Sequence, residues 1–137
     1  MKSLLALLGH SLFLTAAAAS ADPLTPTAAV RRNDSNFKDM VLAVCISRVY
    51  AHQDHAAADA AGTARALVEW TSYDADSAPD QINRLINTYT KRSYRNPIGD
   101  NNGTKFDLLK CLDLYHSKEL NMLASRVVVA PSSVQRK

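Results

Sequence analysis

The chain has 137 residues and a formal net charge of +3, with 47% hydrophobic and 21% charged residues, a composition typical of a globular protein. This length favours one folded domain. Acidic residues are interspersed among the basic ones, so the sequence lacks the clustered basic surface of a nucleic-acid-binding protein, and we expect no nucleic-acid partner.

Residues 1–21 have the three parts of a secretory signal peptide. Lys2 supplies the basic start, residues 4–18 form an apolar run, and Ala19-Ser20-Ala21 is a small-residue cleavage sequence. The alternative is a membrane anchor, but the apolar run is shorter than the roughly 20 residues that a spanning helix needs. We therefore expect cleavage before Asp22, export, and no membrane association afterwards.

The mature chain divides into three parts by composition. Residues 22–35 contain Pro23 and Pro26 and show no sustained periodicity, which predicts a flexible lead. Residues 36–128 carry the periodic apolar pattern of a helical domain. Residues 129–137 follow as an expected disordered tail.

Helical periodicity dominates this domain, because apolar residues recur at i, i+3, i+4 and i+7 in four segments. The four sets are Leu42, Cys45, Ile46, Val49; Ala64, Leu67, Val68, Thr71; Ile82, Leu85, Ile86, Tyr89; and Leu108, Cys111, Leu112, Tyr115. The predicted helices cover about 36–51, 55–72, 79–91 or 79–93, and 105–116, with a last helix from 117 to about 126 or 128. No segment alternates as a strand does, so we predict an all-α, compact, single-domain bundle of four to five helices.

Polar residues at the helix starts indicate where the helices are capped. Ser35 or Asn36 is placed to cap the first helix, Ser77 the third and Ser117 the last, since each side chain can accept a hydrogen bond from a free backbone N–H. Lys110 falls between the apolar positions of its segment, so we expect it to face water.

The two cysteines, Cys45 and Cys111, both occupy apolar helix faces, so both thiols should point into the core. In an exported protein such a pair favours one disulfide between the two helices. The bridge would close a loop of about 66 residues and stabilise the fold by about 4 kcal/mol in the chain-entropy model. The alternative is two buried free thiols; a reactive pair is disfavoured because there is no C-x-x-C motif.

No residue pattern indicates catalysis or a cofactor. His52 and His55 are three residues apart across a predicted helix break, with no glutamate to complete a zinc motif. Cys111 and His116 are five residues apart on one helix and so face different directions. We therefore predict a protein that is not an enzyme and has no cofactor or bound metal. The alternative is a small periplasmic metal- or ligand-binding helical protein that uses His52, His55 and His116.

The surface that best suits protein binding is the outer side of the third predicted helix and the loop after it. Tyrosine and arginine, which are enriched at interfaces, lie there among other polar residues. The candidate contact residues are Asp80, Asn83, Arg84, Asn87, Lys91, Tyr94, Arg95, Asn96 and Asp100. The alternative is an ordinary solvated helix face followed by a tight turn.

Four separated segments carry a family resemblance. They read FKDMVLAVCISRVY, EWTSYDADSA, SYRNPIGDNNGTKF and KFDLLKCLDLYHSKEL, in this order along the chain. Together, over roughly residues 35–128, the sequence resembles the type VI secretion amidase immunity proteins of the fourth amidase-immunity family.

The resemblance implies a small periplasmic helical protein that forms a homodimer and binds a cognate peptidoglycan amidase in a 2:2 complex. The amidase of such a pair resembles a papain-like cysteine peptidase that cuts the stem peptide between D-glutamate and diaminopimelate. The immunity protein blocks its active-site cleft, using the third helix region and the fourth helix of the other subunit. Carried over to this chain, that points to residues 80–91 and 94–100. A rival from another class is an inhibitor of lysozyme-like glycosidases.

Overall fold

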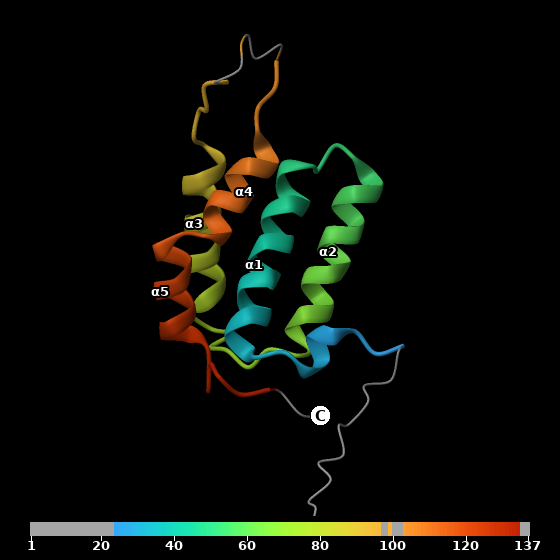
Figure 1. Cartoon of the computed structure of the whole chain (residues 1–137), viewed down its shortest axis with the longest axis vertical. Helices are drawn as coiled ribbons and strands as arrows, with labels where there is room; N and C mark the ends of the chain where they lie inside the picture. Colours follow the sequence, from blue (N-terminus) through green and yellow to red (C-terminus); the bar gives the residue numbers. More distant parts are fainter. Residues whose placement is uncertain (1–23, 97–98, 100–102, 135–137) are drawn as a thin grey trace, which may run out of the picture.

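The structure, a computed structural model, describes residues 24–96, 99 and 103–134, so the predicted signal peptide lies outside the described residues (Figure 1). The described part contains a short 3-10 helix and five α-helices. They are η1 (Thr27–Val30), α1 (Asn33–Val49), α2 (Asp54–Val68), α3 (Ala78–Thr90), α4 (Asp107–Tyr115) and α5 (Lys118–Val127). Within these ranges, β structure is limited to two isolated bridges. The predicted all-α bundle is therefore confirmed.

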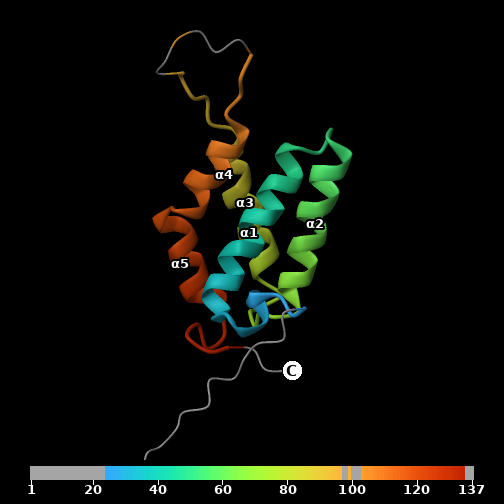
Figure 2. The same ribbon diagram turned by 45° about the vertical axis from the view of Figure 1, so that its right-hand side comes forward.

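Helix α1 is the centre of the bundle. It packs against each of the other four α-helices, and both views place it between α2 on one side and α4 and α5 on the other (Figure 1 and Figure 2). Phe37, Val41 and Cys45 follow one another at intervals of four residues and are all fully buried, because this spacing keeps side chains on one helix face. None of the helices in the described ranges is long and apolar enough to cross a membrane.

The apolar pattern predicts the core face of α3 well and that of α2 in part. In α3, Ile82, Ile86 and Tyr89 are buried, with Leu85 packed beside them. Helix α2 ends at Val68, four residues before the predicted end, and this valine is 41% exposed.

Helix α4 turns a different face to the core from the predicted one. Cys111 and Leu114 are fully buried, whereas Leu108 and Leu112 are 44% and 37% exposed. The helix has only nine residues, and it contains more leucines than one face can bury. Contacts of Cys111 and Leu114 with the core decide the orientation, so two of the predicted core leucines remain at the surface.

Three further expectations need correction. Lys110 does not face water: it is 7% exposed, and its ammonium pairs with the Asp107 carboxylate at 2.9 Å. Ser77 does not cap α3, because its hydroxyl donates to Asp74 Oδ2 at 2.6 Å. Asn36 lies inside α1 rather than at its start.

The cap predicted at Ser117 is confirmed, since its Oγ accepts the Leu120 N–H at 3.1 Å.

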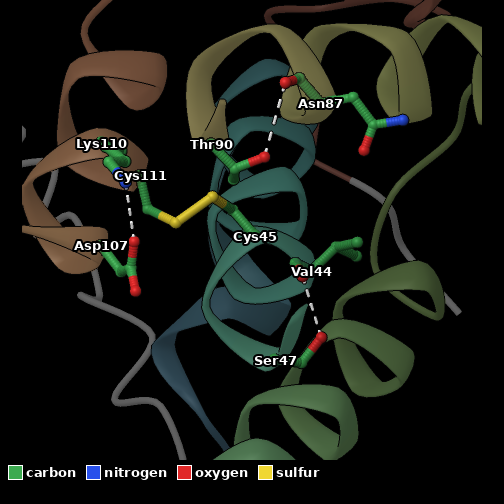
Figure 3. Close-up of a disulfide and its surroundings, with 8 residues drawn as sticks. All are labelled: Val44, Cys45, Ser47, Asn87, Thr90, Asp107, Lys110 and Cys111. Atoms are coloured by element: carbon green, nitrogen blue, oxygen red, sulfur yellow. Dashed lines mark hydrogen bonds and ion pairs between the residues drawn. A yellow bond between two sulfur atoms is a disulfide. The ribbon is translucent and has the colours of Figure 1, made fainter. Parts of the chain in front are cut away.

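A disulfide between Cys45 and Cys111 joins the C-terminal part of α1 to α4, as predicted (Figure 3). The two Cα atoms are 5.8 Å apart, and 66 residues separate the cysteines along the chain. Both cysteines are fully buried. The cross-link therefore holds α4 against α1 while α2 and α3 lie between them in the sequence.

Two buried asparagines at the start of α1 join the ends of the chain at one pole of the bundle. The Asn33 side chain donates to the Val129 carbonyl at 3.1 Å and accepts the Ser72 N–H at 3.2 Å. The Asn36 side chain donates to the carbonyls of Ala28 at 2.8 Å and Trp70 at 3.0 Å. Parts of the predicted lead and tail are thus tied to the helices, which periodicity alone does not indicate.

Removing the disulfide should markedly destabilise the bundle. We expect the double variant Cys45→Ala/Cys111→Ala to lose about 4 kcal/mol of unfolding free energy, because the unfolded chain regains the freedom of a long loop. For a domain of this size the melting temperature should fall by about 15 °C or more. Circular dichroism melts measure this. Reductant under mildly denaturing conditions should lower the melt of the unmodified chain and leave that of the variant unchanged; equal melts of both proteins would contradict the stabilising role.

Candidate functional site

The outward face of α3 is a straight row of polar side chains. Burial of Ile82 and Ile86 against the core turns the opposite side of the helix to solvent. Asp80, Arg84, Asn87 and Lys91, which follow at intervals of three or four residues, are all exposed there. The structure therefore brings these four predicted contact residues onto one surface.

Asn83, also a predicted contact residue, lies at the edge of this row and is only half-buried. Its side-chain oxygen accepts a hydrogen bond from the Arg48 guanidinium of α1. This bond fixes the rotation of α3 relative to α1, so Asn83 helps to position the row as well as belonging to it.

We call the segment between α3 and α4 the arm (residues 91–106), and its described residues continue the row beyond the bundle. Its described parts rise from the pole opposite the two ends of the described chain (Figure 1 and Figure 2). Arg95 is exposed on it, and Tyr94 and Asn96 are half-buried. Asp100, the last predicted contact residue, lies outside the described residues.

The first turn of the arm is held by an aromatic and charged cluster. The Arg92 guanidinium lies 3.6 Å from the centre of the Tyr89 ring, a cation–π contact. The Tyr94 hydroxyl donates to Asp113 of α4, and the Tyr89 hydroxyl donates to Glu119 of α5 at 3.1 Å. The cluster thus joins the end of α3 to α4 and α5, and positions the arm.

The electrostatics of this cluster follow from its hydrogen bonds. Burial, followed by the bond to Asp113, raises the pKa of Tyr94 above its usual value, so this tyrosine remains a neutral donor at physiological pH. The pKa of Glu119 is lowered, first by its own backbone N–H at the start of α5 and then by the Tyr89 hydroxyl. Glu119 is therefore an acceptor for Tyr89 throughout the neutral range.

The other end of the arm has an unusual backbone. Phe106, directly before α4, adopts a left-handed conformation with φ of 54° and ψ of 36°, and Gly103 has φ of 78°. A left-handed phenylalanine is uncommon because its Cβ crowds the backbone, so this corner is held by its surroundings. It directs the chain from the arm into α4.

Beside this corner lies an exposed apolar area, which we call the leucine surface (Leu108, Leu109 and Leu112). These side chains are 44%, 43% and 37% exposed. With Tyr50 and Phe106 they line a hollow of about 500 Å³. This apolar surface is available for contact with another protein.

The histidines do not form a metal site. Among the described residues, no three histidine, cysteine, aspartate or glutamate side chains are grouped so that they could hold a metal ion. His52 and His55 are exposed near the start of α2, while His116 packs edge-on against Tyr115. The alternative of a metal-binding protein therefore has no support from the described geometry.

Sequence reasoning missed Arg92 and the leucine surface. Arg92 follows the predicted polar row directly, and its basic side chain next to Tyr89 and Tyr94 could have indicated a cation–π contact. The exposed leucines could not be identified from the sequence. In an isolated α4 they match the helical apolar pattern as well as the buried residues do, so periodicity does not distinguish the two groups.

Comparisons with known families and structures agree on one assignment. The family model Tai4, described as a type VI secretion system amidase immunity protein, matches residues 35–124. The chain belongs to this family. Its members are immunity proteins and not enzymes, so this chain is an immunity protein against a type VI secreted amidase effector, as the sequence predicts. The comparison with curated proteins finds no match.

Two solved structures resemble the immunity protein. A chain from a study of new type VI-secreted toxins and self-resistance proteins in Serratia marcescens is 29% identical, with a TM-score of 0.72, and the match covers 85% of this chain and 91% of that one. A chain of the Tae4/Tai4 effector–immunity system from Salmonella typhimurium is 25% identical, with a TM-score of 0.64, and the match covers 74% and 95%.

Loosening the base of the arm should expose it to proteolysis. Tyr94→Phe removes the hydroxyl that donates to Asp113, so trypsin should cleave the immunity protein at Arg95 several-fold faster while the helices keep their melting temperature. Mass spectrometry of timed digests measures the rate. Tyr115→Phe removes a matched hydroxyl bond, to Asp39, at the end of α4 away from the arm, and should leave the rate unchanged. Equal rates for Tyr94→Phe and the unmodified protein would show that this bond does not hold the arm.

Proposed function

We propose that this immunity protein binds its cognate type VI secreted peptidoglycan amidase and covers the active-site cleft, protecting the producing cell from its own and sibling toxin. We take the amidase to be a papain-like cysteine peptidase, as the family resemblance implies. The observation that carries the proposal is the exposed row on α3 continued by the arm, which together form a projecting surface.

The proposed contact surface is held rigidly by the core and extends outward from the bundle. Asp80, Arg84, Asn87 and Lys91 are presented by a helix whose opposite face is packed in the core. Arg95 lies on the arm, next to the anchored Tyr94. A surface ordered before binding loses little conformational entropy on docking, so more of the contact energy contributes to affinity.

The remaining proposed contacts have more limited exposure. Asn83 and Asn96 are half-buried, and Asp100 is proposed from sequence alone. Blocking a cleft in this way needs shape and charge matched to its walls, and no reaction by the immunity protein. This agrees with a chain that has no catalytic residue pattern.

We also propose a homodimer, which would give a 2:2 complex with the amidase. Support comes from the leucine surface, because three exposed leucines on one short helix suit burial against a second copy. Association there would bring α4 of one subunit close to the base of the partner's arm. The fourth helix of one copy could then assist the third helix of the other.

We propose that the protein is exported by cleavage of residues 1–21 and acts in the periplasm. The cross-link between Cys45 and Cys111 supports this location, because disulfides persist in oxidising compartments and are rare in the cytosol. The site of action would then be the compartment in which an amidase meets peptidoglycan.

The proposed function predicts tight binding and stoichiometric inhibition. Titration of the mature chain into its cognate type VI secreted amidase should give a Kd in the nanomolar range or tighter, about −12 kcal/mol. Peptidoglycan digestion by that amidase should stop at an equimolar ratio. A lysozyme-type glycosidase assayed in parallel should remain active, which separates this function from glycosidase inhibition. Millimolar binding only, with undiminished digestion, would contradict the proposal.

The proposed dimer predicts that one charge on the leucine surface will separate the subunits. We expect the unmodified chain to sediment at twice its monomer mass and Leu109→Asp to sediment as a monomer with retained helicity, because burying an unpaired carboxylate is unfavourable. Val68→Asp, a similarly exposed apolar-to-acidic change at the end of α2, is the control and should remain dimeric. A dimeric Leu109→Asp variant would place the interface elsewhere.

A further inference from the structure

Helices α3 and α5 run beside each other and leave an open groove of about 300 Å³ between them. Each helix lines the groove with one face, because the lining residues are spaced i, i+3, i+4 and i+7 on both. They are Gln81, Arg84, Leu85 and Thr88 of α3, and Glu119, Met122, Leu123 and Arg126 of α5. We call this the α3–α5 groove.

Hydrogen bonds hold the groove at both ends. At one end the Arg126 guanidinium donates to Gln81 Oε1 at 3.2 Å. At the other end the Tyr89 hydroxyl donates to Glu119 Oε2 at 3.1 Å. The separation of the two helices is therefore set before any partner binds, and a preorganised groove costs little entropy on binding.

The groove carries positive charge that the described protein does not neutralise. Within the described ranges neither Arg84 nor Arg126 lies within ion-pair distance of a carboxylate, although Asp80 is only one turn before Arg84. Glu119, the carboxylate that lines the groove, already accepts from Tyr89, and the positive charges that lower its pKa are those of Arg92 and Lys118. Two guanidinium groups are therefore available to a partner, and guanidinium binds carboxylate with two parallel hydrogen bonds.

An apolar contact is available between the charges. Met122 is 52% exposed on the wall of the groove, while Leu123, at 2%, forms its floor. Methionine and arginine are both enriched in protein interfaces, and the flexible methionine side chain adapts to the shape of a partner. The groove thus suits one carboxylate with an apolar side chain beside it.

We propose that the α3–α5 groove is a further contact region for the amidase, which inserts a segment carrying an acidic side chain next to an apolar one. Arg84 belongs both to the row on α3 and to the groove, so a partner docked on the row extends directly onto α5. The inference rests on the proposed function and adds Met122 and Arg126 to the contact residues. The groove is open along its length, which suits a side chain projecting from a protein surface more than an enclosed small molecule.

Charge reversal at either arginine tests the groove. We expect Arg84→Glu and Arg126→Glu each to weaken binding of the cognate amidase at least about tenfold, because the inserted carboxylate would meet a like charge. The loss should come largely from slower association. The affinity of each variant should also depend less on ionic strength than that of the unmodified protein. Surface plasmon resonance at several salt concentrations measures all three quantities.

Arg65→Glu provides a matched control. Arg65 is exposed in the last turn of α2 as Arg126 is in the last turn of α5, so both changes remove a cation from a helix C-terminus and alter the net charge equally. The two helices lie on opposite sides of α1 (Figure 1 and Figure 2). We expect Arg65→Glu to change the Kd by less than about twofold. Melting curves confirm folding of each variant, and Arg84→Glu tests the groove without altering a helix end.

The outcomes separate the two proposals. If the unmodified chain does not bind the amidase, the proposed function fails, and this inference fails with it. If it binds, but both groove variants bind equally well, the groove inference alone is overturned. The groove inference is also overturned if Arg65→Glu weakens binding as much as Arg126→Glu does, or if the groove variants sediment as monomers while the unmodified chain is a dimer. In the last case the groove holds a second copy of the chain.

Discussion

The cross-link between Cys45 and Cys111 is the constraint on which the proposed binding surface depends. It joins the central helix to α4 within the core, so the helix that follows the arm is attached to α1. Helix α3, which precedes the arm, is held by its buried isoleucines and by the bond from Arg48 of α1 to Asn83. The arm is therefore carried by two helices that are each fixed to the core.

Structural and proposed functional features lie at opposite poles of the bundle. Around Asn33 and Asn36, buried amides connect the start of α1 with the α2–α3 connection and the end of the chain. At the other pole, Arg92, Tyr94 and their partners position the arm. Although Asn36 Oδ1 is buried without a hydrogen-bond partner in the described part of the chain, the bonds that these two amides do make hold separate segments together at the first pole, while the second pole remains exposed for a partner.

The apolar periodicity predicted where the helices lie better than it predicted which residues they pack against. The apolar face of α3 and the cap at Ser117 could be predicted, because each depends on residues close in sequence. The prediction of which face of α4 is buried was wrong because leucines occupy more than one side of that helix. Only contacts with α1 decide which of them are buried, and these involve residues about 66 positions away.

The same distinction applies to the candidate site. The charged row from Asp80 to Lys91 could be predicted from sequence, since it is the complement of an apolar face on one helix. The contribution of Arg126 and Met122 could not, because it requires knowing that α5 lies beside α3. Hydrogen bonds that connect separate helices, such as Tyr94 to Asp113, are likewise evident only in the folded chain.

Occlusion of the catalytic cleft is the central claim, and access to the amidase's active-site thiol tests it most directly. Alkylation of that thiol by iodoacetamide can be followed by mass spectrometry with and without an equimolar amount of this chain. If the immunity protein covers the cleft, alkylation should slow by about thirtyfold, because a complex with a Kd of about 1 nM leaves about 3% of the amidase free when both proteins are at about 1 μM. An unchanged alkylation rate in a complex shown to have formed would contradict the account, because the chain would then bind the amidase without covering its active site.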